Sequence, residues 1–225
     1  VAFLNATLTN VNFSSTSLIN TSFSSAFLRD VDFTAAVWMS NVSFAFALQL
    51  LRVRFTSAPN VFAVNFTSAP LEDVDFSLVE FLNANFDSAK LTSVNFTSAR
   101  LSRDYAISFP SMALLLLFIV ADLEISFHGA RIWETTFDRC NCRLADFTSA
   151  EMLDVVFSHA NLLGVSFRHA TLKHVDFSFA NLRNADFTNA TITDDQLQSA
   201  LSIRNARLPN GTLGHARNLI KHGDA

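Results

Sequence analysis

Large apolar side chains recur along the chain at a spacing that fits neither an ordinary helix nor an ordinary strand. Phenylalanine returns every ten residues, apart from three consecutive steps of eleven between Phe33 and Phe66 and one gap between Phe96 and Phe127. A second large apolar residue usually lies halfway between. The repeating unit is therefore five residues long. On a helix a step of five would spread these side chains around the whole cylinder, and on a straight strand it would alternate them between two faces. The pattern predicts short extended segments that bend once in every unit.

Four bends near a right angle would form a square coil of about twenty residues, with the large side chain of each unit in a shared interior. Phenylalanine would then stack on phenylalanine along two opposite walls, in coils about 4.8 Å apart. A triangular coil would place Phe over Leu, so the period of ten favours the square. The steps of eleven keep the phase, so we expect each extra residue to form a bulge at a corner, with Trp38 facing inward. The expected core ladder is Phe76, Phe86, Phe96, Phe147, Phe157, Phe167, Phe177, Phe187, Leu162, Leu172 and Leu182.

The units at 180–184 (Ala-Asn-Leu-Arg-Asn), 185–189 (Ala-Asp-Phe-Thr-Asn) and 84–88 (Ala-Asn-Phe-Asp-Ser) resemble the pentapeptide-repeat family, whose template is A-(D/N)-(L/F)-x-x. The resemblance implies an all-β fold, a right-handed quadrilateral parallel β-helix, in which the third residue of each unit fills the interior and the first is small. It implies little about chemistry, because the family includes topoisomerase-inhibiting DNA mimics, fused signalling modules and many proteins without known activity.

The repeat predicts five parts of the chain. They are an N-terminal part of the solenoid at 1–101, an irregular apolar insertion at 102–124, a C-terminal part at 125–192, a capping helix with a last repeat at 193–212, and a tail or linker at 213–225. The five-residue repeat is already in phase at Val1, which suggests a truncated start. The insertion contains a ten-residue apolar run, too short to span a membrane. Three interpretations of the insertion are open: it packs on the rod, it contacts a partner or a membrane surface, or it is an artefact of the gene model.

A short helix is expected near the C-terminus, because Thr193 and Gln196 have the spacing of a capping box. A terminal coil must have its apolar end covered, since stacking would otherwise continue between molecules. Capping is therefore the simpler interpretation of this helix. Formation of a homodimer through the cap is the alternative.

The residue types predict neither a catalytic site nor a metal or cofactor site. The five glycines are scattered, which excludes a dinucleotide fingerprint and a phosphate-binding loop. Metal ligands must converge, but the twenty-residue column places His159 between Arg139 and Phe179. Cys140 and Cys142 occupy the small and the large inward positions of one unit, where we expect buried packing residues rather than a disulfide or a redox pair. We therefore expect no enzyme and no cofactor.

Composition and charge exclude other classes of protein. Half of the 225 residues are hydrophobic, so the chain folds, and 16 Lys and Arg interspersed among 20 Asp and Glu offer no surface for direct nucleic-acid binding and no polybasic membrane segment. Eight N-x-S/T sequons give a weak indication of a secreted protein, although the repeat itself places Asn before a buried Phe and Ser or Thr after it. The candidate N-glycosylation sites are Asn5, Asn20, Asn41, Asn189 and Asn210.

Three functional classes remain, of which a non-catalytic structural or protein-interaction scaffold is favoured. Its partner would be an unidentified protein, and the candidate contact residues are Trp133, Phe46, Leu50 and Leu51. Carbohydrate or ice binding on a flat repetitive wall is an alternative, encouraged by outward Ser and Thr and by a tail at 218–225 that is similar to the opening of some carbohydrate-binding modules. Topoisomerase-inhibiting DNA mimicry is the other alternative. It would need continuous columns of acidic residues along the rod, and the twenty-residue coil does not place the Asp and Glu of this sequence in such columns.

Overall fold

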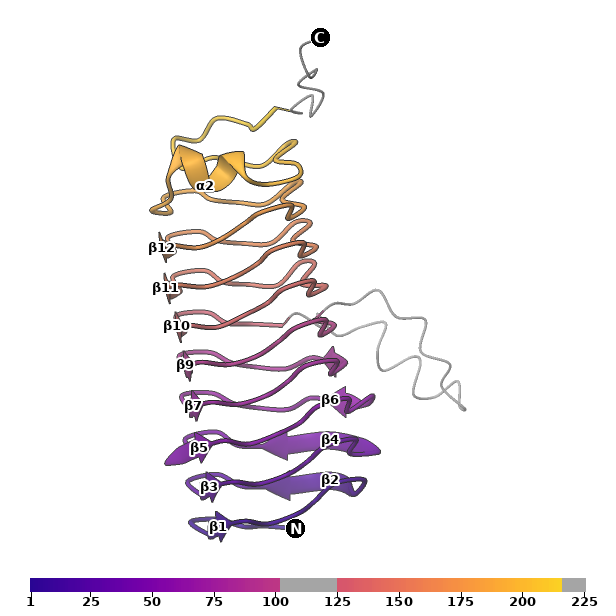
Figure 1. Cartoon of the computed structure of the whole chain (residues 1–225). Coiled ribbons are helices and arrows are strands. Elements are labelled where there is room, and N and C mark those ends of the chain that lie inside the picture. Colours follow the sequence, from indigo (N-terminus) through magenta and orange to yellow (C-terminus); the bar gives the residue numbers. More distant parts are fainter. Residues whose placement is uncertain (102–124, 216–225) are drawn as a thin grey trace.

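Every fifth residue takes the chain around a corner. In the computed structural model, which describes residues 1–101 and 125–215, non-glycine corner residues from Asn5 to Asn205 have φ between 49° and 60°. This left-handed conformation is uncommon outside glycine and is best tolerated by Asn and Asp, and Asn, Asp and Ser fill most of the corners. Four corners bring the chain back above its own start. The coils stack into the rod shown in Figure 1, an all-β parallel β-helix with one short helix near the C-terminus.

The four sides of the coil form four flat faces, each backed by one column of large inward side chains. The column of face A runs from Phe3 to Phe187, that of face B from Leu8 to Ile192, that of face C from Phe13 to Phe177, and that of face D from Leu18 to Ile203. Phenylalanine fills the columns of faces A and C, while mainly aliphatic side chains fill those of B and D. The square coil expected from the period of ten is confirmed.

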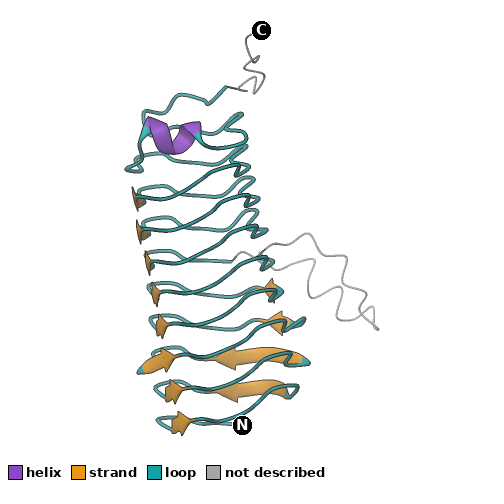
Figure 2. Ribbon diagram, viewed as in Figure 1, coloured by secondary structure: helices purple, strands orange, loops and turns teal. Residues whose placement is uncertain are grey.

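Regular strands lie on faces B and D, on opposite sides of the rod (Figure 2). Face B is an eight-stranded parallel sheet in the order β1-β3-β5-β7-β9-β10-β11-β12, and face D contains the parallel sheet β2-β4-β6-β8. The strands are β1 Thr7–Thr9, β2 Ser17–Ser22, β3 Phe27–Arg29, β4 Trp38–Ser43, β5 Gln49–Leu51, β6 Val61–Phe62, β7 Pro70–Glu72, β8 Phe81–Leu82, β9 Lys90–Thr92, β10 Arg131–Trp133, β11 Glu151–Leu153 and β12 Thr171–Lys173. The helix is α2, Asp194–Gln198.

The core is a ladder of stacked aromatic rings. Phe86 stacks on Phe66 and on Phe127, with ring centroids 4.8 Å apart in both pairs, and meets the rings of Phe76 and Phe96 edge to face at 5.8 and 5.7 Å. Offset stacking along a column and edge-to-face contact across the interior are the arrangements that aromatic quadrupoles prefer. All the residues expected in the core ladder are buried.

The three extra residues of the eleven-residue steps lie just after a corner, between a small and a large inward residue. They are Val37, Leu48 and Pro59, and each is exposed where the chain bends outward. The register survives, as expected, because Leu18 pairs with Met39. Trp38 is not inward, and that expectation is wrong: the extra residue moves Met39 into the core and leaves Trp38 half-buried on the surface.

The coils on either side of residues 102–124 stack directly on one another. Leu91 pairs with Ile132, and the backbone N–H of Leu101 donates to the carbonyl of Asn141 over 2.7 Å. The rod is therefore continuous through its middle. The interpretations of 102–124 as an apolar insertion, a contact or an artefact lie outside the described residues.

Cys140 and Cys142 form a disulfide bond, which corrects the expectation that they are only packing residues. Both are buried, as expected. Side chains two residues apart on one extended segment point the same way, and here the two Cα atoms are 5.6 Å apart, within the range that a disulfide spans. The bond therefore links two adjacent inward positions of a single unit.

Helix α2 closes the C-terminal end of the rod. The Thr193 side chain accepts from the backbone N–H of Gln196, and the Gln196 side chain accepts from the N–H of Thr193, which confirms the capping box. Leu197 of the helix is buried in the core. The Gln196 side chain also donates to two carbonyls of the coil beneath, those of Leu172 and Val175, at 3.1 and 3.0 Å. Among residues 1–101 and 125–215, no helix is long and apolar enough to cross a membrane.

Candidate functional site

Trp133 is the last residue of β10 and lies on the outer surface of face B. The preceding residue, Ile132, is fully buried, so the alternation of the strand turns the next side chain outward. In the register of the sheet Trp133 lies between Thr92 and Leu153, and it is half-buried. The Lys90 ammonium group is 5.0 Å from the centroid of the Trp133 ring, which is a cation–π contact.

An open groove runs from Trp133 along face B towards the C-terminal cap. One recess of about 310 Å³ is lined by Trp133, Glu151, Met152, Leu153, Thr171 and Lys173. A second of about 300 Å³ is lined by Leu172, Lys173, His174, Thr191, Ile192, Thr193 and Gln196. The two adjoin at Lys173, and together we call them the Trp133 groove. The sequence carries a signal for two of these residues, because Leu153 and Lys173 follow Trp133 at steps of twenty.

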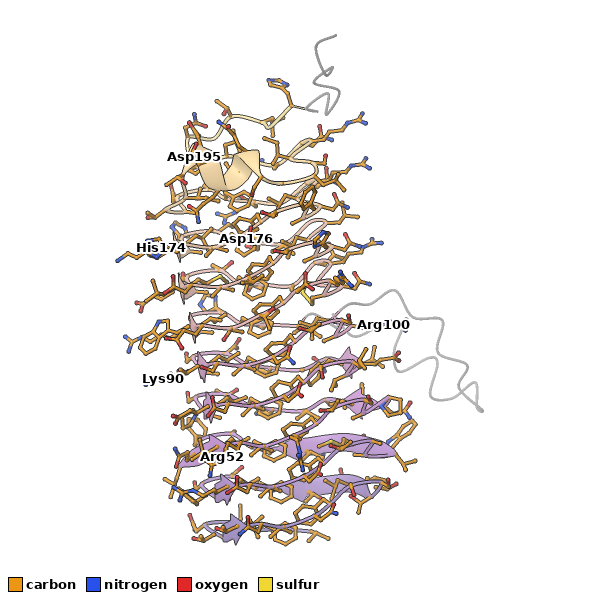
Figure 3. All side chains as sticks on the ribbon, in the orientation of Figure 1. Arg52, Lys90, Arg100, His174, Asp176 and Asp195 are labelled. Carbon is orange, nitrogen blue, oxygen red and sulfur yellow. A yellow bond between two sulfur atoms is a disulfide. The ribbon has the colours of Figure 1, made fainter. Side chains whose placement is uncertain are left out.

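The rim of the Trp133 groove carries charges of both signs. Arg131 Nε is 3.2 Å from Glu151 Oε2, and His174 Nδ1 is 3.0 Å from Asp154 Oδ1. His174 projects from this edge of the rod in Figure 3. Lys173 is exposed between these pairs. The groove thus combines an aromatic and aliphatic floor with paired charges at its rim.

The described residues offer binding groups and no assembled catalytic centre. In that part of the chain, no group of three or more His, Cys, Asp or Glu side chains could hold a metal ion. His159 lies at a corner and stacks on Phe179 with ring centroids 5.1 Å apart, in the column expected from the twenty-residue coil. This histidine is therefore a surface packing residue.

The other contact residues expected from the sequence differ in exposure. Phe46 occupies a corner and is 62% exposed, and the nearby extra residue Leu48 is 68% exposed. Leu50 and Leu51 are buried, so the expectation that they form contacts is wrong. The outward bend at Leu48 moves Leu50 into the inward column of face B, where it pairs with Leu28, and leaves Leu51 only 9% exposed.

The candidate glycosylation sites lie at exposed turns. Asn5, Asn20, Asn41 and Asn189 are corner residues in the left-handed conformation, and the Asn41 side-chain amide donates to Asn20 Oδ1 over 2.8 Å. Asn210 accepts from the backbone and the hydroxyl of Thr212 in the last turn. In the sequons at Asn12, Asn65 and Asn95, the carboxamide oxygen instead accepts the backbone N–H two residues further on. These three asparagines brace the corners.

Several aspartates make the same hydrogen bond as these asparagines, because their carboxylate oxygen accepts the backbone N–H two residues further on. Burial raises the pKa of Asp186, but hydrogen bonds from the hydroxyl and the backbone N–H of Thr188 outweigh it, and the net pKa is below the usual value. For Asp176 burial is again opposed, here by hydrogen bonds from Ser158 and Ser178, and its pKa is also lowered. Both carboxylates are thus held ionised by local hydrogen bonds, which indicates a structural role rather than a role as a general acid.

Acidic and basic side chains alternate along the corner between faces B and C. Arg52 Nε is 2.7 Å from Asp30 Oδ1, and hydrogen bonding to this guanidinium lowers the pKa of Asp30. Asp73 lies on the other side of Arg52, and the group lines an open recess of about 360 Å³. In the neighbouring column of face C, Arg54 lies between Asp32 and Asp75. Each acidic pair is therefore interrupted by a cation.

Comparison with known proteins identifies the repeat. A family model described as a pentapeptide repeat region matches residues 124–216, and a model described as pentapeptide repeats (8 copies) matches residues 3–34 and 63–103. Together these matches cover more than half of the chain. No curated protein matches the chain by sequence.

Several solved structures are similar over most of their length. QnrB1, a plasmid-mediated fluoroquinolone resistance protein, is 14% identical, with 93% of this chain and 94% of that chain covered and a TM-score of 0.49. HetL, a pentapeptide repeat protein of the cyanobacterium Nostoc involved in heterocyst differentiation regulation, is 17% identical, with coverage of 91% and 92% and a TM-score of 0.34. A pentapeptide repeat protein of the Arabidopsis thaliana thylakoid lumen is 22% identical, with coverage of 62% and 79% and a TM-score of 0.37. Since the family models match most of the described coils, the chain belongs to the pentapeptide repeat family.

Proposed function

We propose that this protein is a non-catalytic interaction scaffold whose face B binds a protein partner at the Trp133 groove. Members of the pentapeptide repeat family are generally non-catalytic. The observation that carries the proposal is the groove itself: Trp133 and Leu153 form an apolar floor, with charged side chains at its rim. Tryptophan is enriched among the residues that dominate binding energy, and a partly desolvated ring surrounded by polar groups is their typical setting.

The two alternative functions receive less support from the arrangement of side chains. DNA mimicry needs closely spaced anionic rows, but Arg52 and Arg54 interrupt the acidic columns at the B–C corner and on face C. A surface for ice or a flat carbohydrate face needs a regular uncharged lattice. The threonine column of face C is broken by Asp138, and Arg54 lies in the column beside it.

The first test of the proposed function uses Trp133 as its own reporter. The chain contains two tryptophans, so a Trp38→Phe background leaves Trp133 as the only source of tryptophan fluorescence. A partner captured on the full chain and then purified should shift the emission of Trp133 on binding, because the ring would be further desolvated. In the natural background, Trp133→Ala should raise the Kd at least tenfold, since a buried interface tryptophan contributes about 2 kcal/mol or more.

The matched control is Phe179→Ala, which removes an exposed aromatic ring from a corner remote from face B. We expect it to leave the Kd within about twofold of the parent value. A purified partner whose Kd is unchanged by Trp133→Ala, with no change in Trp133 emission on binding, would show that the partner uses another face. That result would remove the Trp133 groove from the proposal.

A further inference from the structure

The disulfide between Cys140 and Cys142 lies in the interior of the rod, away from solvent. The two residues are 1% and 0% exposed, and both belong to the shared hydrophobic core. Exchange of a disulfide begins when a thiolate attacks one of its sulfur atoms, so the rate depends on access to that sulfur. The charged thiolate of a reductant would have to enter an apolar interior, which is unfavourable. The folded rod should therefore protect this bond.

The coils on both sides hold this unit in place. The backbone N–H of Asn141 donates to the carbonyl of Ala99 in the coil beneath, over 3.0 Å. In the coil above, the carbonyl of Asn161 accepts from the N–H of Cys142, and the N–H of Asn161 donates to the carbonyl of Cys140, both over 2.9 Å. Exposing either sulfur atom would require the unit to separate from a neighbouring coil. The free energy of such local opening slows every reaction that depends on it.

The interior can also accommodate this unit without the bond. In the inward column of face D, Cys142 lies between Leu101 and Leu162, while Cys140 occupies a small inward position. Cysteine is smaller than leucine, so the column has room for two separate thiols. A free cysteine packs as a small hydrophobic residue. We therefore expect the reduced chain to form the same rod.

The same burial would protect the two thiols of a reduced rod. The thiolate is the reacting form of cysteine, and a cysteine buried in apolar surroundings is unreactive. Oxidation by a disulfide also passes through a mixed disulfide, in which one cysteine carries a thiol group of the oxidant. A close-packed core has no space for that group. Cys140 and Cys142 should therefore react only before this part of the chain closes or after it opens.

We propose that the Cys140–Cys142 unit retains the redox state of the compartment in which the chain folds. In an oxidising compartment, one cysteine thiolate attacks a disulfide oxidant, either oxidised glutathione or a thiol–disulfide oxidoreductase, and releases one thiol. The second cysteine attacks the mixed disulfide and releases the other thiol. The two cysteine thiols thus become one disulfide, and the oxidant becomes two thiols that carry the two protons. In a reducing compartment the cysteines remain thiols while the chain folds.

A reversible redox switch is the alternative, and the burial of both cysteines argues against it. Cysteines that sense redox changes are accessible to solvent, so that oxidant and reductant reach them in the folded protein. The proposal is also independent of the Trp133 groove. The groove lies on face B, and the disulfide belongs to face D on the opposite side of the rod (Figure 2). Failure of one proposal leaves the other standing.

Refolding the full chain from denaturant, with oxidised glutathione or with dithiothreitol, gives the two forms to be compared. Circular dichroism should show the same β-sheet content in both. Dithiothreitol should reduce the disulfide in the folded chain at least about a hundredfold more slowly than in denaturant, because the coil must first open. Oxidised glutathione should oxidise the folded dithiol form more slowly than the unfolded chain by a similar factor. Alkylation of free thiols followed by mass spectrometry measures both rates.

The matched control carries an exposed cysteine pair with the same spacing. Thr7 and Thr9 are exposed residues of strand β1, and the variant Thr7→Cys/Thr9→Cys is made in a Cys140→Ala/Cys142→Leu background. The background substitutions copy the alanine and leucine that other coils place at these two positions. Dithiothreitol should reduce the disulfide of the control at rates within about tenfold in the folded and unfolded chain, because access requires no opening.

Equal rates of reduction of the natural disulfide in the folded and unfolded chain would overturn the proposal and indicate a reversible switch. Oxidation of the folded dithiol form at the rate of the unfolded chain would overturn it as well. A reduced chain without the β-sheet spectrum would also contradict the proposal, because the fold would then require the bond and could not preserve both states. Free thiols after refolding with oxidised glutathione would contradict the bond itself.

Discussion

Replacing Phe86 by alanine is expected to lower the free energy of unfolding by about 3–5 kcal/mol, the range for truncating a fully buried aromatic residue. Phe86 lies in the middle of the rod and stacks on Phe66 and Phe127, and its ring edge meets those of Phe76 and Phe96. The alanine variant removes the ring from all these contacts at once. Because the neighbouring coils are held apart by their backbone hydrogen bonds, the core cannot close over the cavity. Chemical denaturation followed by circular dichroism gives the free energy.

Phe179→Ala is the matched control for this prediction. Phe179 is 61% exposed at a corner and stacks on His159, a surface histidine, so we expect a loss below about 1 kcal/mol. Two variants of similar cost would contradict the assignment of Phe86 to a shared core. In a repeat protein a weakened coil can also unfold locally, so the slope of the denaturation curve should be compared between variants.

Gln196→Ala is expected to have the second largest effect, a loss of about 2–3 kcal/mol. The side chain closes the capping box with Thr193, and its amide donates to the carbonyls of Leu172 and Val175 in the coil beneath. Alanine would remove the cap interaction and leave both carbonyls without that donor, and loss of a cap and loss of a buried partner each cost about 1 kcal/mol or more. The thermal unfolding midpoint measures the combined effect.

Gln198→Ala is the control, because Gln198 lies in the same helix with an exposed side chain. Alanine is a stronger helix former than glutamine, so this variant should leave the unfolding midpoint unchanged or raise it slightly. An unfolding midpoint for Gln196→Ala equal to that of Gln198→Ala would show that the helix does not hold the last coils together. The account of α2 as a cap would then be wrong.

The architecture could be predicted from the sequence because one rule repeats. Every unit places its large side chain in the same environment, so a step of five residues determines the bend, the four faces and the column neighbours of residues such as His159 and Asp186. The corners themselves are less visible in the sequence. Their left-handed residues are often Asn, Asp or Ser, but Leu78 and Phe179 adopt the same conformation, because the stacked coils on both sides impose it.

The expectations for Trp38, Leu50 and Leu51 were wrong because these residues lie where one unit departs from the rule. An extra residue can lie before or after the large inward position, and the repeat that follows keeps its phase in both cases. The sequence therefore did not distinguish Trp38 from Met39 as the inward residue. Leu50 and Leu51 were misjudged for the same reason. The disulfide between Cys140 and Cys142 lies in a regular unit, where the sequence pattern alone does not distinguish two packed thiols from a bond. The 5.6 Å between their two Cα atoms, which allows the bond, is a property of the folded coil.

The candidate sites were only partly predictable. Trp133 could be placed on the surface because its neighbour Ile132 occupies an inward position. The groove beside it depends on the conformations of the surrounding side chains, and the spacing of residues in the sequence does not determine these.

The continuity of the rod is tested most directly by deleting residues 104–124. This deletion leaves Ser102 and Arg103 between Leu101 and Ile125, which restores the two-residue spacing of an ordinary corner. If the coils on either side stack directly, as the pairing of Leu91 with Ile132 indicates, the shortened chain should keep its β-sheet circular dichroism and unfold in one transition within about 5 °C of the parent midpoint. Loss of the β-sheet spectrum, or two separate unfolding transitions, would contradict a single continuous stack of coils.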